Sequence, residues 1–189
     1  LLAAGSKIII IPTLIALVIS QGKPSKKYII ALLFSWLGDT LLIPEGTSFF
    51  IAGIAAFWIT QLLYCSLMLS LLGGTLGQQF SKRKALLPLA LVGAYLIGTI
   101  YIMFPRLGDL LIPVGLYACT LSITGFLGIL LWRETKTTAH LAMGCFLFMV
   151  SDSMIAFDAF YFSEAVFTHW VMITYIPAQY LISLLLRKS

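Results

Sequence analysis

Charged side chains are scarce in this sequence. Only 10% of its 189 residues are charged, whereas 60% are hydrophobic, and the mean hydropathy is +1.03. A soluble domain carries about 25% charged residues, so this chain has too little polar surface to fold in water. Apolar runs of about 20 residues recur instead, and each is long enough to cross a bilayer core of about 30 Å. The composition therefore predicts a membrane protein.

Several sequence signals are missing as well. The strict alternation of apolar and polar residues that is typical of a membrane barrel is absent, whereas helices satisfy their own backbone hydrogen bonds in lipid. No A-x-A-like cleavage site follows Leu1, so we expect no signal peptide in this sequence. The initiator Met is lacking, so we expect an upstream segment. The apolar runs predict an all-α, polytopic transmembrane helix bundle that forms a single domain over residues 1–189. Its seven spans are expected at about 1–20, 27–43, 49–72, 85–104, 109–132, 139–159 and 166–186.

Cysteine and glycine give little chemical signal. Cys65, Cys119 and Cys145 each fall inside a predicted span, with neither metal-ligand spacing nor an obvious pairing scheme. We interpret them as buried, small apolar residues. Gly93 and Gly98 lie within one span, where glycine is expected to allow close contact between helices.

Basic residues mark one side of the predicted bundle. Ten of the twelve lie in every second connection or at the C-terminus, whereas the intervening connections carry Glu45, Asp109, Asp158 and Glu164 with the single Arg106. Because cytoplasmic loops are enriched in Lys and Arg, we place the basic connections and the C-terminus in the cytoplasm. The net charge of +5 then reflects topology and contact with lipid headgroups, and it requires no nucleic-acid partner.

Three ionisable residues, Lys7, Asp39 and Asp152, lie well inside predicted spans. Charges in lipid are costly and by default mark a functional site. With about 1.5 Å of rise per residue, all three lie roughly 7–10 Å inside the outer boundary, so they can share one layer. Each aspartate follows a small residue, Gly38 or Ser151, that lets a neighbouring backbone or a substrate approach closely.

The two aspartates admit two interpretations. One of them could simply pair with Lys7 and join two helices. Two carboxyl groups and one lysine leave an excess acid, however, and a low-dielectric site favours its protonated form. A protonated acid beside an ionised one is the arrangement that general acid–base catalysis requires.

Polar side chains also occur on the remaining spans. Each of them alone is typical of a hydrogen bond that joins packed helices, but together with the aspartates they predict a polar cavity inside the bundle. These residues are Gln61, Tyr64, Tyr117, Tyr175 and Gln179.

An ordered set of motifs resembles the YhhN family, whose characterised members are lysoplasmalogenases. The matching segments cover nearly the whole chain and are Lys7–Pro12, Phe34–Asp39, Phe50–Tyr64, Ile112–Tyr117, Gly144–Phe160 and Thr174–Ile182. The chain departs from the family at Gln61, where the family usually has His. The family also has a helix ahead of the one that carries Lys7, so we expect an eighth, N-terminal span that this chain lacks.

The resemblance implies hydrolysis of the vinyl ether bond of lysoplasmalogen to a fatty aldehyde and a glycerophospho-base, without a metal or cofactor. Asp39 and Asp152 would be the catalytic pair: one protonates the β-carbon, and the other steadies the resulting cation and activates water. Lys7 would pair with a carboxylate or attract the phosphate of the lysophospholipid. The other substrate-pocket residues implied are Gln61, Tyr64, Tyr117, Ser151, Tyr175 and Gln179. The expected partners are this substrate and membrane lipid, and the expected location is the bacterial inner membrane.

Two other classes of function remain open. A proton-coupled carrier for a small or lipid-like solute uses intramembrane aspartates equally well, and it predicts broken helices, for which Pro12, Pro113 and Pro177 leave room. A structural assembly module would tolerate loss of either aspartate. A retinal protein is disfavoured, because the last span has no Lys for a Schiff base.

Overall fold

Nearly all of the described chain is helical. The computed structural model describes residues 2–75, 85–135, 138–162 and 166–186, apart from the side chains of residues 2–7, 75, 135 and 186. The helices begin and end close to the boundaries of the predicted spans. They are α1 (Leu2–Ser20), α2 (Lys26–Leu41), α3 (Thr47–Leu72), α5 (Leu86–Leu107), α6 (Leu111–Thr135), α7 (Ala139–Tyr161) and α8 (Thr168–Leu186), with the short 3-10 helices η1 (Gly73–Thr75) and η2 (Gly108–Leu110).

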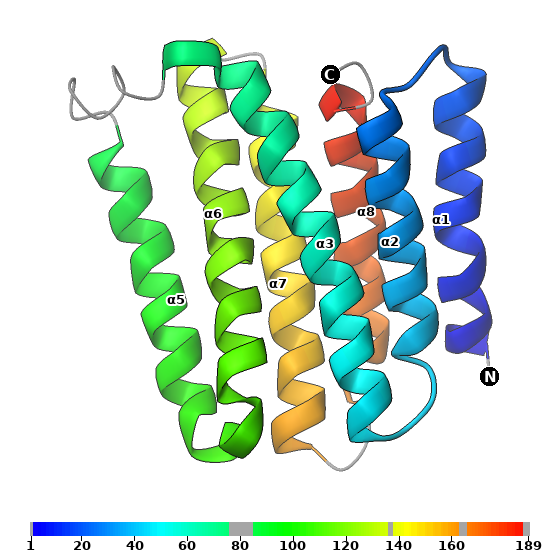
Figure 1. The fold of residues 1–189 in the computed structure, drawn as a ribbon, viewed down its shortest axis with the longest axis vertical. Coiled ribbons are helices and arrows are strands. Elements are labelled where there is room, and N and C mark those ends of the chain that lie inside the picture. Colours follow the sequence, from blue (N-terminus) through cyan, green and yellow to red (C-terminus); the bar gives the residue numbers. More distant parts are fainter. Residues whose placement is uncertain (1, 76–84, 136–137, 163–165, 187–189) are drawn as a thin grey trace.

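Successive helices run in opposite directions, so the connections alternate between the two ends of the bundle (Figure 1). The α1–α2 connection, which contains Lys23, lies at the same end as the C-terminus; we call this the basic end. The α2–α3 connection with Glu45 and the α5–α6 connection with Asp109 lie at the opposite end. This alternation agrees with the charge pattern of the sequence, although residues 76–84 and 136–137 lie outside the described part.

The helices form one bundle with α5 and α1 at its two edges (Figure 1). Helix α5 packs on α6 and α7, whereas α1 packs on α2 and α8; between these edges, α3 contacts α2, α6 and α8, and α7 contacts α6 and α8. Side chains such as Tyr28, Leu32, Met68, Phe148 and Ile182 fill the interior and are fully or almost fully buried. The polar residues of the interior are therefore held between packed helices.

The apolar character of the helices supports insertion in a membrane. Three stretches of the described residues are long and apolar enough to cross a bilayer, namely Thr47–Leu72, Leu86–Glu134 and Ala139–Tyr161. The second of them covers α5 and all but the last residue of α6. The apolar part of α1, Ile8–Ser20, is shorter. Large apolar side chains also cover the outside of the bundle, and Tyr101 is 81% exposed. Together with the composition, these features identify an integral membrane protein. The sequence predicted seven membrane crossings, and these three stretches do not establish that number.

Glycine allows close packing at specific places. A Cβ atom added to Gly38 would lie 2.6 Å from the Phe57 ring, and one added to Gly144 would lie 3.0 Å from the Ala178 carbonyl oxygen. The close approach beside Asp39 is thus made by a side chain, whereas the sequence predicted a neighbouring backbone or a substrate there. The expectation of close helix contact at Gly93 and Gly98 was wrong, because no atom lies within 4 Å of a Cβ at either position. Both glycines are on the edge helix α5, which has fewer neighbours to approach.

The cysteines also differ from one another. Cys65 and Cys145 are buried, as expected, but Cys119 is exposed. Sequence position within an apolar run could not separate these cases, because a helix in lipid is apolar on its outer face as well as on its inner face.

Candidate functional site

Asp39 lies at the centre of a hydrogen-bonded network between α2 and α8. The Tyr175 hydroxyl donates to Asp39 Oδ2 at 2.8 Å, and it lies 2.7 Å from the Ser35 hydroxyl. The Gln179 amide nitrogen donates to Ser35 Oγ at 2.7 Å and to the Tyr175 hydroxyl at 3.1 Å. All four residues are buried. Their arrangement follows from helical spacing, since Ser35 and Asp39, like Tyr175 and Gln179, are four residues apart and share a face.

Helix α3 contributes Tyr64 to this network. Its hydroxyl donates to Gln179 Oε1 at 2.8 Å, so both ends of the Gln179 amide are bonded. The Tyr64 ring stacks on Tyr28, with 6.0 Å between the ring centroids. We call Asp39, Ser35, Tyr175, Gln179 and Tyr64 the Asp39 network. It joins three helices in the interior of the bundle.

Asp152 lies in a second polar cluster, formed by α6 and α7. The Tyr117 hydroxyl donates a short hydrogen bond to Asp152 Oδ2. No described residue forms a hydrogen bond with Asp152 Oδ1. Tyr95 from α5 lies next to this pair: its hydroxyl is 2.8 Å from Ser153 Oγ, and it interacts electrostatically with Asp152. One carboxyl oxygen of Asp152 is therefore held in place, and the other is available to a further group.

A small cavity adjoins Asp152. Its volume is about 50 Å³, which exceeds the roughly 10–15 Å³ that one buried water needs but is far below the roughly 300–1,000 Å³ of ordinary ligand pockets. Apart from Asp152 and Tyr117 its walls are apolar, and the lining residues are Leu42, Phe50, Ile54, Phe57, Val114, Tyr117, Asp152, Ile155, Ala156 and Phe160. We call this space the inner cavity.

Asp39 is not among the residues that line the inner cavity. The expectation that both carboxyl groups face one cavity is therefore corrected, because α2 presents Asp39 to α8 while α7 presents Asp152 to α6. The two groups are still close enough to interact electrostatically. Phe57 connects their surroundings, since its ring packs on Tyr175 at 6.2 Å between centroids and also lines the inner cavity.

Gln61 lies on α3, one helical turn after Phe57. Its side chain is completely buried, yet neither its amide nitrogen nor its amide oxygen has a hydrogen-bond partner. The amide lies close to the Tyr117 hydroxyl, although it makes no hydrogen bond of normal geometry with it. Gln61 thus belongs to the Asp152 side of the site, whereas Tyr64, one turn further along, belongs to the Asp39 network.

The structure assigns neither Ser151 nor Lys7, two predicted pocket residues, to the inner cavity or to the Asp39 network. The Ser151 hydroxyl donates to the Val171 carbonyl oxygen at 3.4 Å, so it joins α7 to α8, and Ser151 is not among the residues that line the inner cavity. Lys7 lies in α1, but its side chain is outside the described residues. Ser35 and Tyr95 were missed at the sequence level. Their only signal was a polar side chain at the depth of an aspartate, which many packing residues share.

A larger pocket lies at the end of the bundle opposite the basic end, and it borders the inner cavity. It has a volume of about 570 Å³ and includes Glu45, Asp158 and Thr168 in its wall. Leu42, Phe50, Ile155 and Phe160 line both spaces. We call this pocket the vestibule, because it leads from the end of the bundle to the side chains that cover Asp152.

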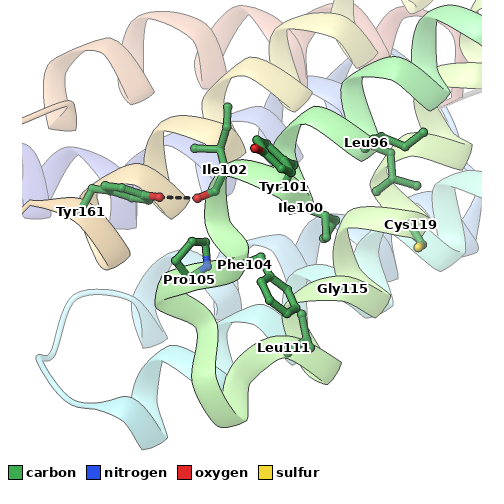
Figure 2. A pocket seen from close by; sticks show the side chains of 11 residues that line it. Leu96, Ile100, Tyr101, Ile102, Phe104, Pro105, Leu111, Gly115, Cys119 and Tyr161 are labelled. Carbon is green, nitrogen blue, oxygen red and sulfur yellow. Dashed lines mark hydrogen bonds between the residues drawn. The ribbon is translucent and has the colours of Figure 1, made fainter.

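Another pocket, larger than the vestibule, has neither aspartate in its wall. It is an apolar groove of about 850 Å³ on the outside of α5 and α6, with the exposed side chains of Tyr101 and Cys119 in its wall (Figure 2). Tyr161 closes one end and donates a hydrogen bond to the Ile102 carbonyl oxygen (Figure 2). This groove holds no acid–base group of the two clusters, so size alone does not identify the reactive site. Among the described residues, no group of three or more His, Cys, Asp or Glu could hold a metal ion.

Comparison with known proteins gives a consistent result. The sequence matches the YhhN family over residues 2–186. It is 32% identical over 164 residues to lysoplasmalogenase TMEM86A of Bos taurus, an alignment that covers 82% of this chain and 62% of that protein. It is 30% identical over 164 residues to lysoplasmalogenase TMEM86A of Homo sapiens, with the same coverage of 82% and 62%. The chain thus spans about three-fifths of the length of these relatives. No solved structure matches it.

Proposed function

Because this chain belongs to the YhhN family, we propose that it is a membrane hydrolase that cleaves the vinyl ether bond of lysoplasmalogen. The products are a fatty aldehyde and a glycerophospho-base. The names of the bovine and human relatives support this substrate class. The single observation that carries the mechanism is Asp152, which faces a small apolar cavity with one carboxyl oxygen bonded to Tyr117 and the other free of described partners.

Vinyl ethers are hydrolysed through slow protonation of the β-carbon, which gives an oxocarbenium ion that water then attacks. Protonating carbon requires a well-placed acid. Asp152 fits this role, because an apolar surrounding favours the neutral form of a carboxyl group. Its Oδ1 would carry the proton into the inner cavity while Tyr117 fixes Oδ2.

Asp39 is proposed as the ionised partner. It accepts a hydrogen bond from Tyr175, and hydrogen bonds to a carboxylate favour its charged form. Since the two carboxyl groups interact electrostatically, a negative Asp39 would stabilise the positive charge that develops when Asp152 gives up its proton. Stabilising charge that exists only in the transition state lowers the barrier directly.

The vestibule is proposed as the entrance for substrate. It opens at the end of the bundle that carries Glu45, where a lysophospholipid headgroup meets water, and it borders the inner cavity. We further propose that all seven α-helices cross the membrane with the basic end in the cytoplasm. The protein would then reside in the bacterial inner membrane and bind its substrate from the outer leaflet.

The proton-coupled carrier is the second candidate. It calls for broken helices around the aspartates, but α2 and α7 are continuous where they carry Asp39 and Asp152, and α1 and α8 continue through Pro12 and Pro177. This continuity favours the hydrolase. A structural module gives no reason for Asp152 to border a cavity.

The hydrolase is tested with purified protein and lysoplasmalogen, following aldehyde release. We expect wild type to release aldehyde and both Asp152→Asn and Asp39→Asn to lose at least about a hundredfold in rate, as is common when a group acts in general acid–base catalysis. Asp109→Asn is the matched control, since Asp109 is exposed at the end of the bundle and belongs to neither cluster. Unchanged rates in both test variants would refute the acid–base assignment. Absence of aldehyde from wild type, with solute uptake by vesicles that contain the protein, would favour the carrier.

A further inference from the structure

Gln61 is an exception to the usual pairing of buried polar groups. Its side chain is 0% exposed, and neither polar atom of its amide makes a hydrogen bond of normal geometry with a described residue. Most buried polar side chains are hydrogen-bonded, because an unsatisfied donor or acceptor loses its interactions with water and gains nothing in return. Gln179, the other buried amide of the site, has both ends bonded. The contrast indicates that the Gln61 amide serves a group that is not part of the protein.

The position of Gln61 identifies that group. Gln61 is not itself among the residues that line the inner cavity, but Phe57, four residues earlier on the same face of α3, is one of them. The Gln61 amide is next to the Tyr117 hydroxyl, which is bonded to Asp152. The inner cavity has room for a water but not for a lipid tail. We propose that Gln61 holds the water molecule that captures the oxocarbenium ion.

This inference rests on the proposed vinyl ether hydrolysis, which requires a water molecule to attack the oxocarbenium ion. When Asp152 transfers its proton, the electrons of the double bond form a C–H bond, and positive charge is shared by the ether oxygen and the adjacent carbon. A water oxygen then bonds to that carbon and gives a proton to the Asp152 carboxylate. The hemiacetal so formed breaks its bond to the glycerol oxygen, which takes up the hydroxyl proton, and the aldehyde is released.

Lysoplasmalogen contains a competitor for water. The carbon next to the ether-bearing carbon of its glycerol carries a free hydroxyl group. If that oxygen attacks the cation and loses its proton to the same carboxylate, a five-membered cyclic acetal forms and no carbon–oxygen bond is cleaved. Well-oriented intramolecular groups reach effective molarities of about 10⁵–10⁸ M, so randomly placed water would lose this competition. A water fixed by a buried amide removes the advantage of the substrate hydroxyl.

The experiment compares product ratios in place of rates. Wild type, Gln61→Met and Gln61→Asn are incubated with lysoplasmalogen at neutral pH, and aldehyde and cyclic acetal are separated by chromatography and identified by proton NMR, because the acetal is an isomer of the substrate. We expect aldehyde from wild type and at least a tenfold higher acetal-to-aldehyde ratio from Gln61→Met, which keeps the size of the side chain. Gln61→Asn, which keeps the amide, should lower that ratio again. Leu62→Met on the same helix is the matched control, since Leu62 is exposed.

The outcomes separate this role from the proposed function. If wild type and Gln61→Met both release aldehyde with the same product ratio, the water-holding role of Gln61 is overturned and the hydrolase stands. A folded Gln61→Met protein that consumes no substrate also overturns the role, because capture follows the slow proton transfer. If wild type forms neither product, the hydrolase itself is refuted. Gln61→Ala replaces Gln61→Met should the latter not fold, as judged by thermal unfolding.

Discussion

The Tyr175 hydroxyl donates a 2.8 Å hydrogen bond to Asp39 Oδ2 and so joins α8 to α2. These residues are 136 positions apart in the chain, and the bond lies in the buried interior. The Tyr175 ring also packs on Phe57, which lines the inner cavity. Tyr175 therefore orients the carboxylate proposed to stabilise the cation and at the same time supports the wall of the cavity.

Removing only the Tyr175 hydroxyl should weaken catalysis without disrupting packing. Hydrogen bonds to charged groups contribute about 1.5–3 kcal/mol, and about 1.4 kcal/mol corresponds to tenfold in rate. We therefore expect Tyr175→Phe to lower kcat/KM for lysoplasmalogen by about ten- to a hundredfold. Tyr101→Phe is the matched control, because the Tyr101 side chain lies on the outside of α5. Equal rates for wild type and Tyr175→Phe would contradict the proposed role of Asp39.

The contact between Gly38 and Phe57 should make position 38 intolerant of a methyl group. A Cβ there would lie 2.6 Å from the ring, and overpacking of this kind costs about 1–3 kcal/mol. Gly38→Ala should accordingly lower the temperature of thermal unfolding in detergent, and it should lower activity through displacement of Phe57. Gly93→Ala is the matched control, because a Cβ at Gly93 meets no atom within 4 Å. A similar unfolding temperature for the two variants would show that Phe57 moves aside freely.

The boundary between the vestibule and the inner cavity should control substrate entry. Leu42 lines both spaces, so Leu42→Trp should narrow the passage and lower kcat/KM for lysoplasmalogen by about tenfold or more, in keeping with the sensitivity of catalysis to small displacements. Leu37→Trp, on an exposed position of α2, should leave it unchanged. If Leu42→Trp retains full kcat/KM, substrate reaches Asp152 by another route.

The proposed orientation can be measured by labelling introduced cysteines in intact cells. Cys119 is exposed, so it is first replaced by Ala. A membrane-impermeant maleimide should then label Glu45→Cys in intact cells and Lys23→Cys only after lysis, because the two residues lie at opposite ends of the bundle (Figure 1). The reverse pattern would place the vestibule on the cytoplasmic side.

The helices were predictable because apolar length alone determines them. The ends of each predicted span lie within a few residues of the ends of a helix. The apolar pattern stops at Pro44 and Gly46, which lie between the end of α2 and the start of α3. The sequence also indicated some of the polar residues that surround Asp39, since Tyr175 and Gln179 do lie in the Asp39 network. A charged group in lipid needs such partners, and few side chains of this sequence can supply them.

The facing of individual residues was not predictable in the same way. Adjacent residues on a helix point about 100° apart, so Ser151 faces α8 while Asp152 faces α6. In a soluble protein the polar face would have fixed the rotation of each helix, but here both faces are apolar. For the same reason the sequence could predict a common depth for the two aspartates, which stays a prediction, but it could not show that they belong to different clusters.

The smallness of the inner cavity has a consequence for how the membrane would influence the proposed hydrolase. A space of about 50 Å³ admits a substrate chain only when the surrounding side chains move apart. Such movement widens the bundle within the plane of the bilayer and does work against the lateral pressure of the lipids. Turnover should therefore depend on lipid order, and a protein placed in fluid, loosely packed vesicles should work faster than the same protein in stiff ones.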